Sequence, residues 1–101
     1  MKTERHQFII KDAAPPTIEV DTEASAVYIR FKRTAVAKTV PQESEGMHIA
    51  VDLDAKGEVV GIEAIGFKQF SLEFLLKAAC VKAPKLDFSR AQYVPAELAH
   101  S

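Results

Sequence analysis

The sequence of 101 residues contains one cysteine, four glycines and no tryptophan. A single cysteine excludes an intramolecular disulfide and a zinc site built from thiolates. The apolar run near the N-terminus, Phe8-Ile9-Ile10, is far too short for a signal peptide. No stretch approaches the ~20 apolar residues of a membrane span. We therefore expect a cytoplasmic protein without a membrane segment.

An excess of charge of one sign is lacking too. The chain has 13 Lys and Arg residues against 14 Asp and Glu residues, which gives a net charge of −1. Such a balance creates no general attraction to nucleic acid or to anionic lipid. A basic group near one predicted hairpin could contact nucleic acid, but it has few charges and little aromatic interleaving. Edge strands also carry such charges against aggregation. The group consists of Arg30, Lys32, Arg33 and Lys38. We expect no nucleic-acid partner.

The length fits one domain, and the sequence contains no internal repeat and no long linker. Residues 1–16 form a polar lead-in that ends at Ala13-Ala14-Pro15-Pro16, in which Phe8-Ile9-Ile10 could form a short edge strand. We expect the folded domain at residues 17–94 and a loose C-terminal tail at residues 95–101.

Alternating apolar and polar residues predict the strands. The alternation is clean over Ala26–Arg33, where Val27, Ile29 and Phe31 point one way, and again over Met47–Leu53. Thr17–Val20 and Glu58–Ile65 are further strands, and Ala35–Val40 is a weaker one that Pro41 ends or marks as an edge.

A turn at Asp54-Ala55-Lys56-Gly57 joins two of these strands, with Asp at its first position and Gly at its fourth. A two-residue loop would pair Val51 with Val60. A three-residue loop with Gly57 as a bulge would pair Val51 with Gly61 instead. We favour the first pairing, because a slip by one residue would turn Glu63 towards the core.

A helix is predicted over residues 71–82. Ser71 is a suitable N-cap, and apolar residues follow it at helical spacing. They are Leu72, Leu75, Leu76 and Ala79, with a second stripe at Phe74, Ala78 and Val81. Two stripes indicate a helix that is covered on two sides. The sheet covers one side, and residues 85–94 or a second subunit cover the other.

These elements predict an α+β fold. We expect an antiparallel β-meander of four to five strands in chain order, with one main C-terminal helix packed on one face. The surplus apolar surface of the helix also makes a homodimer an expectation.

Side chains with possible chemistry lie on the outward face of the predicted sheet. Tyr28 and Arg30 share that face and could bind an anion or a partner, or they could belong to an ordinary solvated face. His48 and Glu63 face each other in the favoured register. Acid–base catalysis would need such a pair in a cleft with a third orienting group, so we interpret the pair as a surface contact.

Other candidates have simpler structural explanations. Asp52 and Asp54 could share a face, but a hard cation needs more oxygen ligands, and Asp54 is explained as a turn former. Cys80 lies among apolar residues near the C-terminal end of the predicted helix, so we expect a buried structural thiol. The sequence has no phosphate-binding glycine loop and no serine nucleophile motif. We expect no metal, no cofactor and no enzymatic activity.

Residues 18–66 resemble a bacterial family, domain of unknown function 2283. The resemblance is carried by Glu23-Ala24-Ser25-Ala26-Val27-Tyr28-Ile29-Arg30, Ile49-Ala50-Val51-Asp52-Leu53-Asp54 and Gly57-Glu58-Val59-Val60-Gly61-Ile62-Glu63. The chain departs from the family pattern at Ser25, where Asp is usual, and at Val20, where an aromatic residue is frequent. The resemblance implies a small antiparallel sheet of prokaryotic origin. Because some members are encoded beside small toxin-like proteins, it also implies a binding role.

Two classes of function follow. The first is a small non-catalytic protein-interaction module, either antitoxin-like or a regulatory partner, which would show a flat polar face and no deep pocket. The alternative is a small-molecule-binding protein or enzyme with a site at a dimer interface, which would show convergent polar groups around Tyr28, Arg30 and Glu63. The absence of a nucleophile with a base and an orienting group favours the first class.

Overall fold

The computed structural model describes residues 7–11, 14–42, 47–66 and 71–95. Its main feature is a six-stranded sheet in the order β4-β5-β6-β3-β2-β8. The strands are β2 (Thr17–Asp21), β3 (Ala26–Arg30), β4 (Lys38–Pro41), β5 (His48–Leu53), β6 (Val59–Ile65) and β8 (Gln92–Pro95). A second, two-stranded sheet pairs β1 (Phe8–Ile9) with β7 (Val81–Lys82) in parallel. One α-helix, α1 (Leu72–Ala78), and a short 3₁₀-helix, η1 (Phe88–Arg90), complete the described elements.

The α+β class and the largely antiparallel sheet are confirmed, but the expected meander of four to five strands in chain order is wrong, because the main sheet has six strands in another order. β3 pairs with β6, and residues 31–37 carry the chain past β6 and β5 to the edge strand β4. β8 then adds to the other edge, parallel to β2. The C-terminal segment thus contributes an edge strand as well as a cover for the core, where Leu86 is buried. Its alternation of polar and apolar residues is too short to predict a strand.

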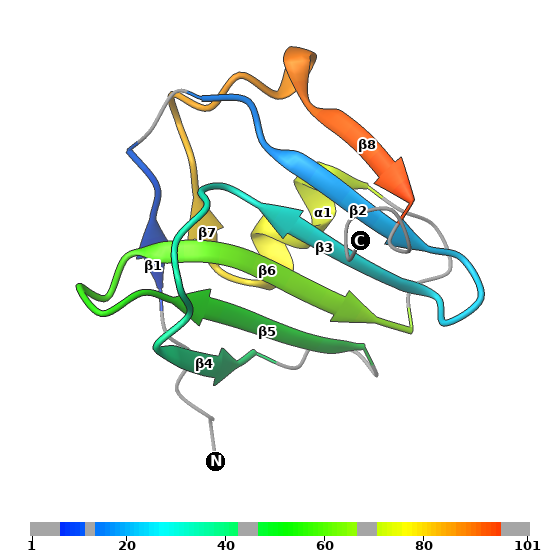
Figure 1. The fold of residues 1–101 in the computed structure, drawn as a ribbon, viewed down its shortest axis with the longest axis horizontal. Coiled ribbons are helices and arrows are strands. Elements are labelled where there is room, and N and C mark those ends of the chain that lie inside the picture. Colours follow the sequence, from blue (N-terminus) through cyan, green and yellow to red (C-terminus); the bar gives the residue numbers. More distant parts are fainter. Residues whose placement is uncertain (1–6, 12–13, 43–46, 67–70, 96–101) are drawn as a thin grey trace.

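One hydrophobic core lies between the sheet and α1. The inward residues of the strands join Leu75, Leu76, Ala78 and Ala79 in a single buried cluster. Figure 1 shows α1 on the far side of the sheet, behind β2 and β3. The described part of the chain places no helix over the near face, where the polar residues of the alternating strands lie.

The helix begins as predicted and ends early. The Ser71 side chain accepts a hydrogen bond from the Phe74 amide at 3.3 Å, as an N-cap does. Cys80 has a left-handed φ of 60°, and its amide donates to the Lys77 carbonyl, which closes the helix. Val81 and Lys82 then form β7, so the predicted helix to residue 82 is wrong. Cys80 is half-buried rather than buried.

The hairpin register differs from both sequence-based alternatives. At the turn, Leu53 pairs with Val59 and Gly57 has a φ of 82°, which is the three-residue loop that we did not favour. A bulge at Val60 then shifts the register by one more residue, so that Val51 pairs with Ile62. The three-residue loop and the bulge each shift the pairing by one residue. Together they return the side chains of β6 to the faces that the favoured pairing predicted. Glu63 therefore stays outside the core, although the favoured pairing of Val51 with Val60 is wrong.

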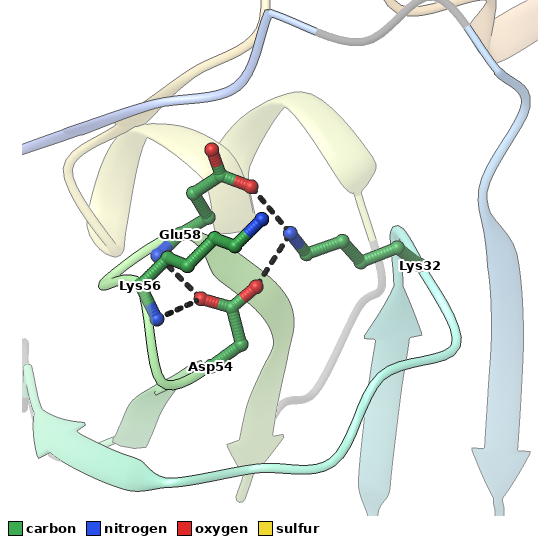
Figure 2. Close-up of polar contacts among 4 residues, drawn as sticks. All are labelled: Lys32, Asp54, Lys56 and Glu58. Carbon is green, nitrogen blue, oxygen red and sulfur yellow. Dashed lines mark hydrogen bonds and ion pairs between the residues drawn. The ribbon is translucent and has the colours of Figure 1, made fainter.

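Two groups of polar contacts hold the ends of these strands. The Asp54 carboxylate accepts hydrogen bonds from the Lys56 and Glu58 amides, at 2.9 Å each. Figure 2 shows the Lys32 ammonium between the Asp54 and Glu58 carboxylates, 2.6 Å from an oxygen of each. On the core side, the buried Gln42 side chain donates to the Ala79 carbonyl at 2.6 Å and so satisfies the C-terminus of α1.

Candidate functional site

The face of the sheet opposite α1 carries no described helix and is crossed at one end by residues 31–37; we call it the uncovered face. It contains a hollow of about 370 Å³ over the middle strands. Tyr28 and Glu63 both line it, because they are directly opposed across β3 and β6. Arg30 lies two residues further along β3 on the same face. The structure thus brings the three predicted partner-binding residues together. The other lining residues are Glu19, Asp21, Ala26, Val27, Val36 and Asp52.

Tyr28 occupies the middle of this surface. Its ring lies where a side chain at Gly61 would be, because a Cβ atom there would overlap with Tyr28 Oη and Cζ. The hydroxyl donates to Asp52 Oδ2 at 2.8 Å, across β6 on strand β5. Burial and this hydrogen bond to Asp52 raise the pKa of Tyr28 above its ordinary value. Tyr28 therefore stays protonated and fixed across three strands.

Arg30 is held on both sides. Its Nε donates to Glu19 Oε2 at 2.9 Å, and its guanidinium lies 5.0 Å from the centre of the Tyr28 ring. The hydrogen bond to Glu19 is the main cause of the raised pKa of Arg30. Glu19 is only 6% exposed, so Arg30 is the counter-ion of a buried carboxylate. Arg30 thus has a structural role on this face, because it neutralises Glu19.

The remaining carboxylates of the hollow lack such a counter-ion. Asp52 accepts a hydrogen bond from the Tyr28 hydroxyl, and its other carboxylate oxygen accepts one from the Thr39 hydroxyl at 2.6 Å. Asp21 accepts from the Ala24 amide in the β2–β3 turn. Glu63 is exposed and forms no ion pair with any described residue. The hollow is therefore acidic, with four carboxylates and one guanidinium among its lining residues.

Other sequence-based candidates are not brought together. The shifted register pairs His48 with Ile65 and Glu63 with Ala50, so the predicted His48–Glu63 pair is wrong. Asp52 lies on the open face, whereas Asp54 faces Lys32 at the turn. The search of the described residues found no group of three or more His, Cys, Asp or Glu side chains that could hold a metal ion.

Two of the four basic residues predicted near one hairpin are neutralised by ion pairs. Arg30 pairs with Glu19, and Lys32 pairs with Asp54 and Glu58. The hydrogen bond to Lys32 is the main cause that lowers the pKa of Asp54 to about 2, and backbone amides of the turn add to it. The Lys32 pKa is correspondingly raised. These cations stabilise the fold and leave the open face acidic.

Sequence reasoning missed Glu19 and Gly61 as parts of this surface. The alternation of Thr17-Ile18-Glu19-Val20 places Glu19 on the outward face, and a short turn brings β2 beside β3. A lone glycine within a strand is typical of close approach by a neighbouring group. Both signals are present in the sequence, but only the register of β3 against β6 identifies Tyr28 as that group.

No helix among the described residues is long and apolar enough to cross a membrane. Comparison with curated proteins found no match, and neither did comparison with solved structures. The chain matches the family described as "Protein of unknown function (DUF2283)" over residues 17–68. That segment contains β2 to β6 and all the residues that line the acidic hollow, among them Tyr28, Asp52 and Glu63. The chain therefore belongs to the DUF2283 family.

Proposed function

We propose that the chain is a small non-catalytic protein-interaction module that binds a partner on the uncovered face of its sheet. The observation that carries the proposal is the acidic hollow on this face, in which Tyr28, Asp52 and Glu63 lie together while α1 covers only the opposite face. A sheet needs to bury only one face to form a core. The second face is available for a partner.

The chemistry of the face fits binding better than proton transfer. A general acid or base works best with a pKa near the working pH. The pKa values of Tyr28 and Arg30 are both raised from ordinary values that already lie well above neutrality. Both groups therefore keep their protons, and their mutual contacts fix the surface in one arrangement. A fixed polar surface favours specific docking.

The edges of the sheet favour the face as the docking site. β4 ends at Pro41 and β8 ends at Pro95, and these are the two edge strands. Proline has no backbone N–H and so weakens the addition of a further strand. A partner strand would gain few hydrogen bonds at either edge, whereas the hollow on the face offers side chains from four neighbouring strands.

The volume of the hollow favours a second candidate function, the binding of a small molecule. About 370 Å³ lies at the lower end of the range of small-molecule pockets, which is roughly 300–1,000 Å³. On this alternative, a second subunit would close the hollow. The exposed side chains of Val36 and Ile65 beside the hollow offer apolar surface for such a homodimer. We also expect a prokaryotic, cytoplasmic protein with an antitoxin-like or regulatory role.

The test compares two charge reversals on opposite faces. Glu63→Lys alters the acidic hollow, and Glu73→Lys makes the same change at an exposed residue of α1. Tagged wild type and both variants capture prey from a lysate of the cells that produce the chain. Each prey is then purified and its direct binding measured by calorimetry. Circular dichroism melting verifies that both variants are folded.

We expect one purified protein to bind wild type and Glu73→Lys equally well and Glu63→Lys at least about tenfold more weakly, a loss of about 1.4 kcal/mol. A prey that binds all three chains equally would contradict docking on this face. Capture of no direct binder, together with saturable uptake of a metabolite by the wild type alone, would favour the small-molecule alternative.

A further inference from the structure

We propose that the partner is a basic protein segment that places an Arg or Lys side chain in the acidic hollow, between Glu63 and Asp52. This inference rests on the proposed function and names the chemistry of its partner. It is carried by charge complementarity on the uncovered face, by the exposed apolar residues beside the hollow, and by the fixed positions of the groups that line it.

The charges of the hollow are unequal. Glu19 pairs with Arg30 at 2.9 Å, and although the guanidinium also attracts Asp52, one cation leaves the four lining carboxylates in excess. Asp21, Asp52 and Glu63 form no ion pair with a described residue. Asp52 is half-buried, and its hydrogen-bond donors among the described residues are two hydroxyl groups. An added cation would be attracted by more than one carboxylate, because Glu63 and Asp52 lie on adjacent strands of the same face, and a hollow screens their charges less than a flat surface does.

The apolar residues beside the hollow favour a protein segment over a small cation. Val36 lines the hollow and is 46% exposed, and Ile65 lies two residues after Glu63 on the same face and is 39% exposed. Ala26, which pairs with Ile65, also lines the hollow. A segment that alternates basic and apolar side chains could contact the carboxylates and these residues together. A small polyamine would satisfy only the carboxylates.

The groups that line the hollow are already ordered, which lowers the entropic cost of binding. Tyr28 is fixed by its hydrogen bond to Asp52 and by its position over Gly61. Arg30 is fixed by its ion pair with Glu19, so the guanidinium does not compete with an incoming cation for Glu63. The free carboxylate of Glu63 is thus the group that an incoming cation meets first.

The first experiment titrates the ¹⁵N-labelled chain with a capped pentapeptide of alternating arginine and alanine. The same peptide with glutamate in place of arginine is the charge control, and spermidine is the small-cation control. We expect amide shift changes centred on Tyr28, Asp52 and Glu63. The arginine peptide should bind more tightly than spermidine, and the glutamate peptide should leave the spectrum unchanged. The affinity for the arginine peptide should fall as NaCl rises from about 0.05 M to about 0.5 M.

Matched variants separate a specific site from general attraction between charges. Glu63→Gln should weaken the arginine peptide at least about fivefold, and Glu63→Lys at least about twentyfold, whereas Glu73→Lys on α1 should change its Kd by less than about twofold. Equal weakening by Glu63→Lys and Glu73→Lys would overturn the inference, as would equal or tighter binding of spermidine or shift changes centred on α1.

The failure of this inference can be told apart from failure of the proposed function. If the arginine peptide does not bind but a purified prey is still lost through Glu63→Lys, the face is a docking site and its partner is not basic. If the purified prey is unaffected by Glu63→Lys, the proposed function itself fails.

Discussion

The ring of Tyr28 lies over the backbone of Gly61, in the space that a side chain at position 61 would fill. Gly61 pairs with Arg30 on β3 and with Asp52 on β5. The missing side chain lets the Tyr28 hydroxyl cross β6 and reach Asp52 at 2.8 Å. A glycine and an aromatic residue on neighbouring strands thus fix the centre of the uncovered face.

Substitution of Gly61 tests this relationship. In Gly61→Ala, the new methyl group displaces the Tyr28 ring and breaks its hydrogen bond to Asp52. We expect a loss of about 1–2 kcal/mol in the free energy of unfolding, measured by urea denaturation. In a Tyr28→Ser background the same change should be neutral or stabilising by roughly 0.5 kcal/mol, since alanine loses less entropy than glycine in a strand. Equal losses in both backgrounds would contradict the account.

The phenol of Tyr28 should titrate above the ordinary tyrosine pKa of 10.0, because it is partly buried and donates to Asp52. The chain has two tyrosines, so Tyr93→Phe leaves Tyr28 as the only phenol to follow by its ultraviolet absorbance. A raised pKa in the folded state means that the contribution to stability is complete below pH 10 and is lost as the pH rises further. A folded-state pKa at or below 10 would contradict the Asp52 hydrogen bond.

Asp54 should make the hairpin sensitive to acid. Lys32 and the amides of the turn lower its pKa from 3.8 to about 2. Its contribution to stability is therefore present above pH 3.8 and is lost as the pH falls through about 2. We expect Asp54→Asn to melt about 5 °C below the wild type near neutral pH. The difference should narrow towards pH 2, and a difference that stays constant with pH would contradict the assignment.

Arg30 should act on stability through Glu19. Arg30→Ala leaves a carboxylate that is 6% exposed without its counter-ion. The expected loss is about 1–3 kcal/mol in the free energy of unfolding. Adding Glu19→Gln should restore part of it, because the neutral amide tolerates burial better than a charge. If the double variant is as unstable as the sum of the two single variants, the pair is not coupled.

The sequence predicted much of this fold because the signals are local. Alternation within β3 and β5 places Tyr28 and Arg30 outside and Val27 and Ile29 inside, and Ser71 marks the start of α1. The face on which Glu63 lies was also predictable, because alternation along β6 places it opposite to the buried Ile62 and Ala64.

Non-local pairing was not predictable in the same way. The bulge at Val60 and the pairing of β3 with β6 depend on contacts between distant residues. The same holds for the end of α1. The apolar pattern continues to Val81, but pairing of β7 with β1 takes Val81 into a strand. Tertiary contacts outweigh helical periodicity at this position. The contact of Tyr28 with Gly61 and Asp52 depends on the registers of β6 with β3 and β5, so the sequence pattern alone did not predict it.

Mapping of the complex by NMR tests whether a partner binds on the uncovered face around Glu63. Amide shifts of the ¹⁵N-labelled chain are compared with and without the purified partner. We expect the largest shift changes at Tyr28, Asp52, Glu63 and Ile65, and no shift changes in α1. Changes centred on α1, or on the edge strands β4 and β8, would contradict binding on this face.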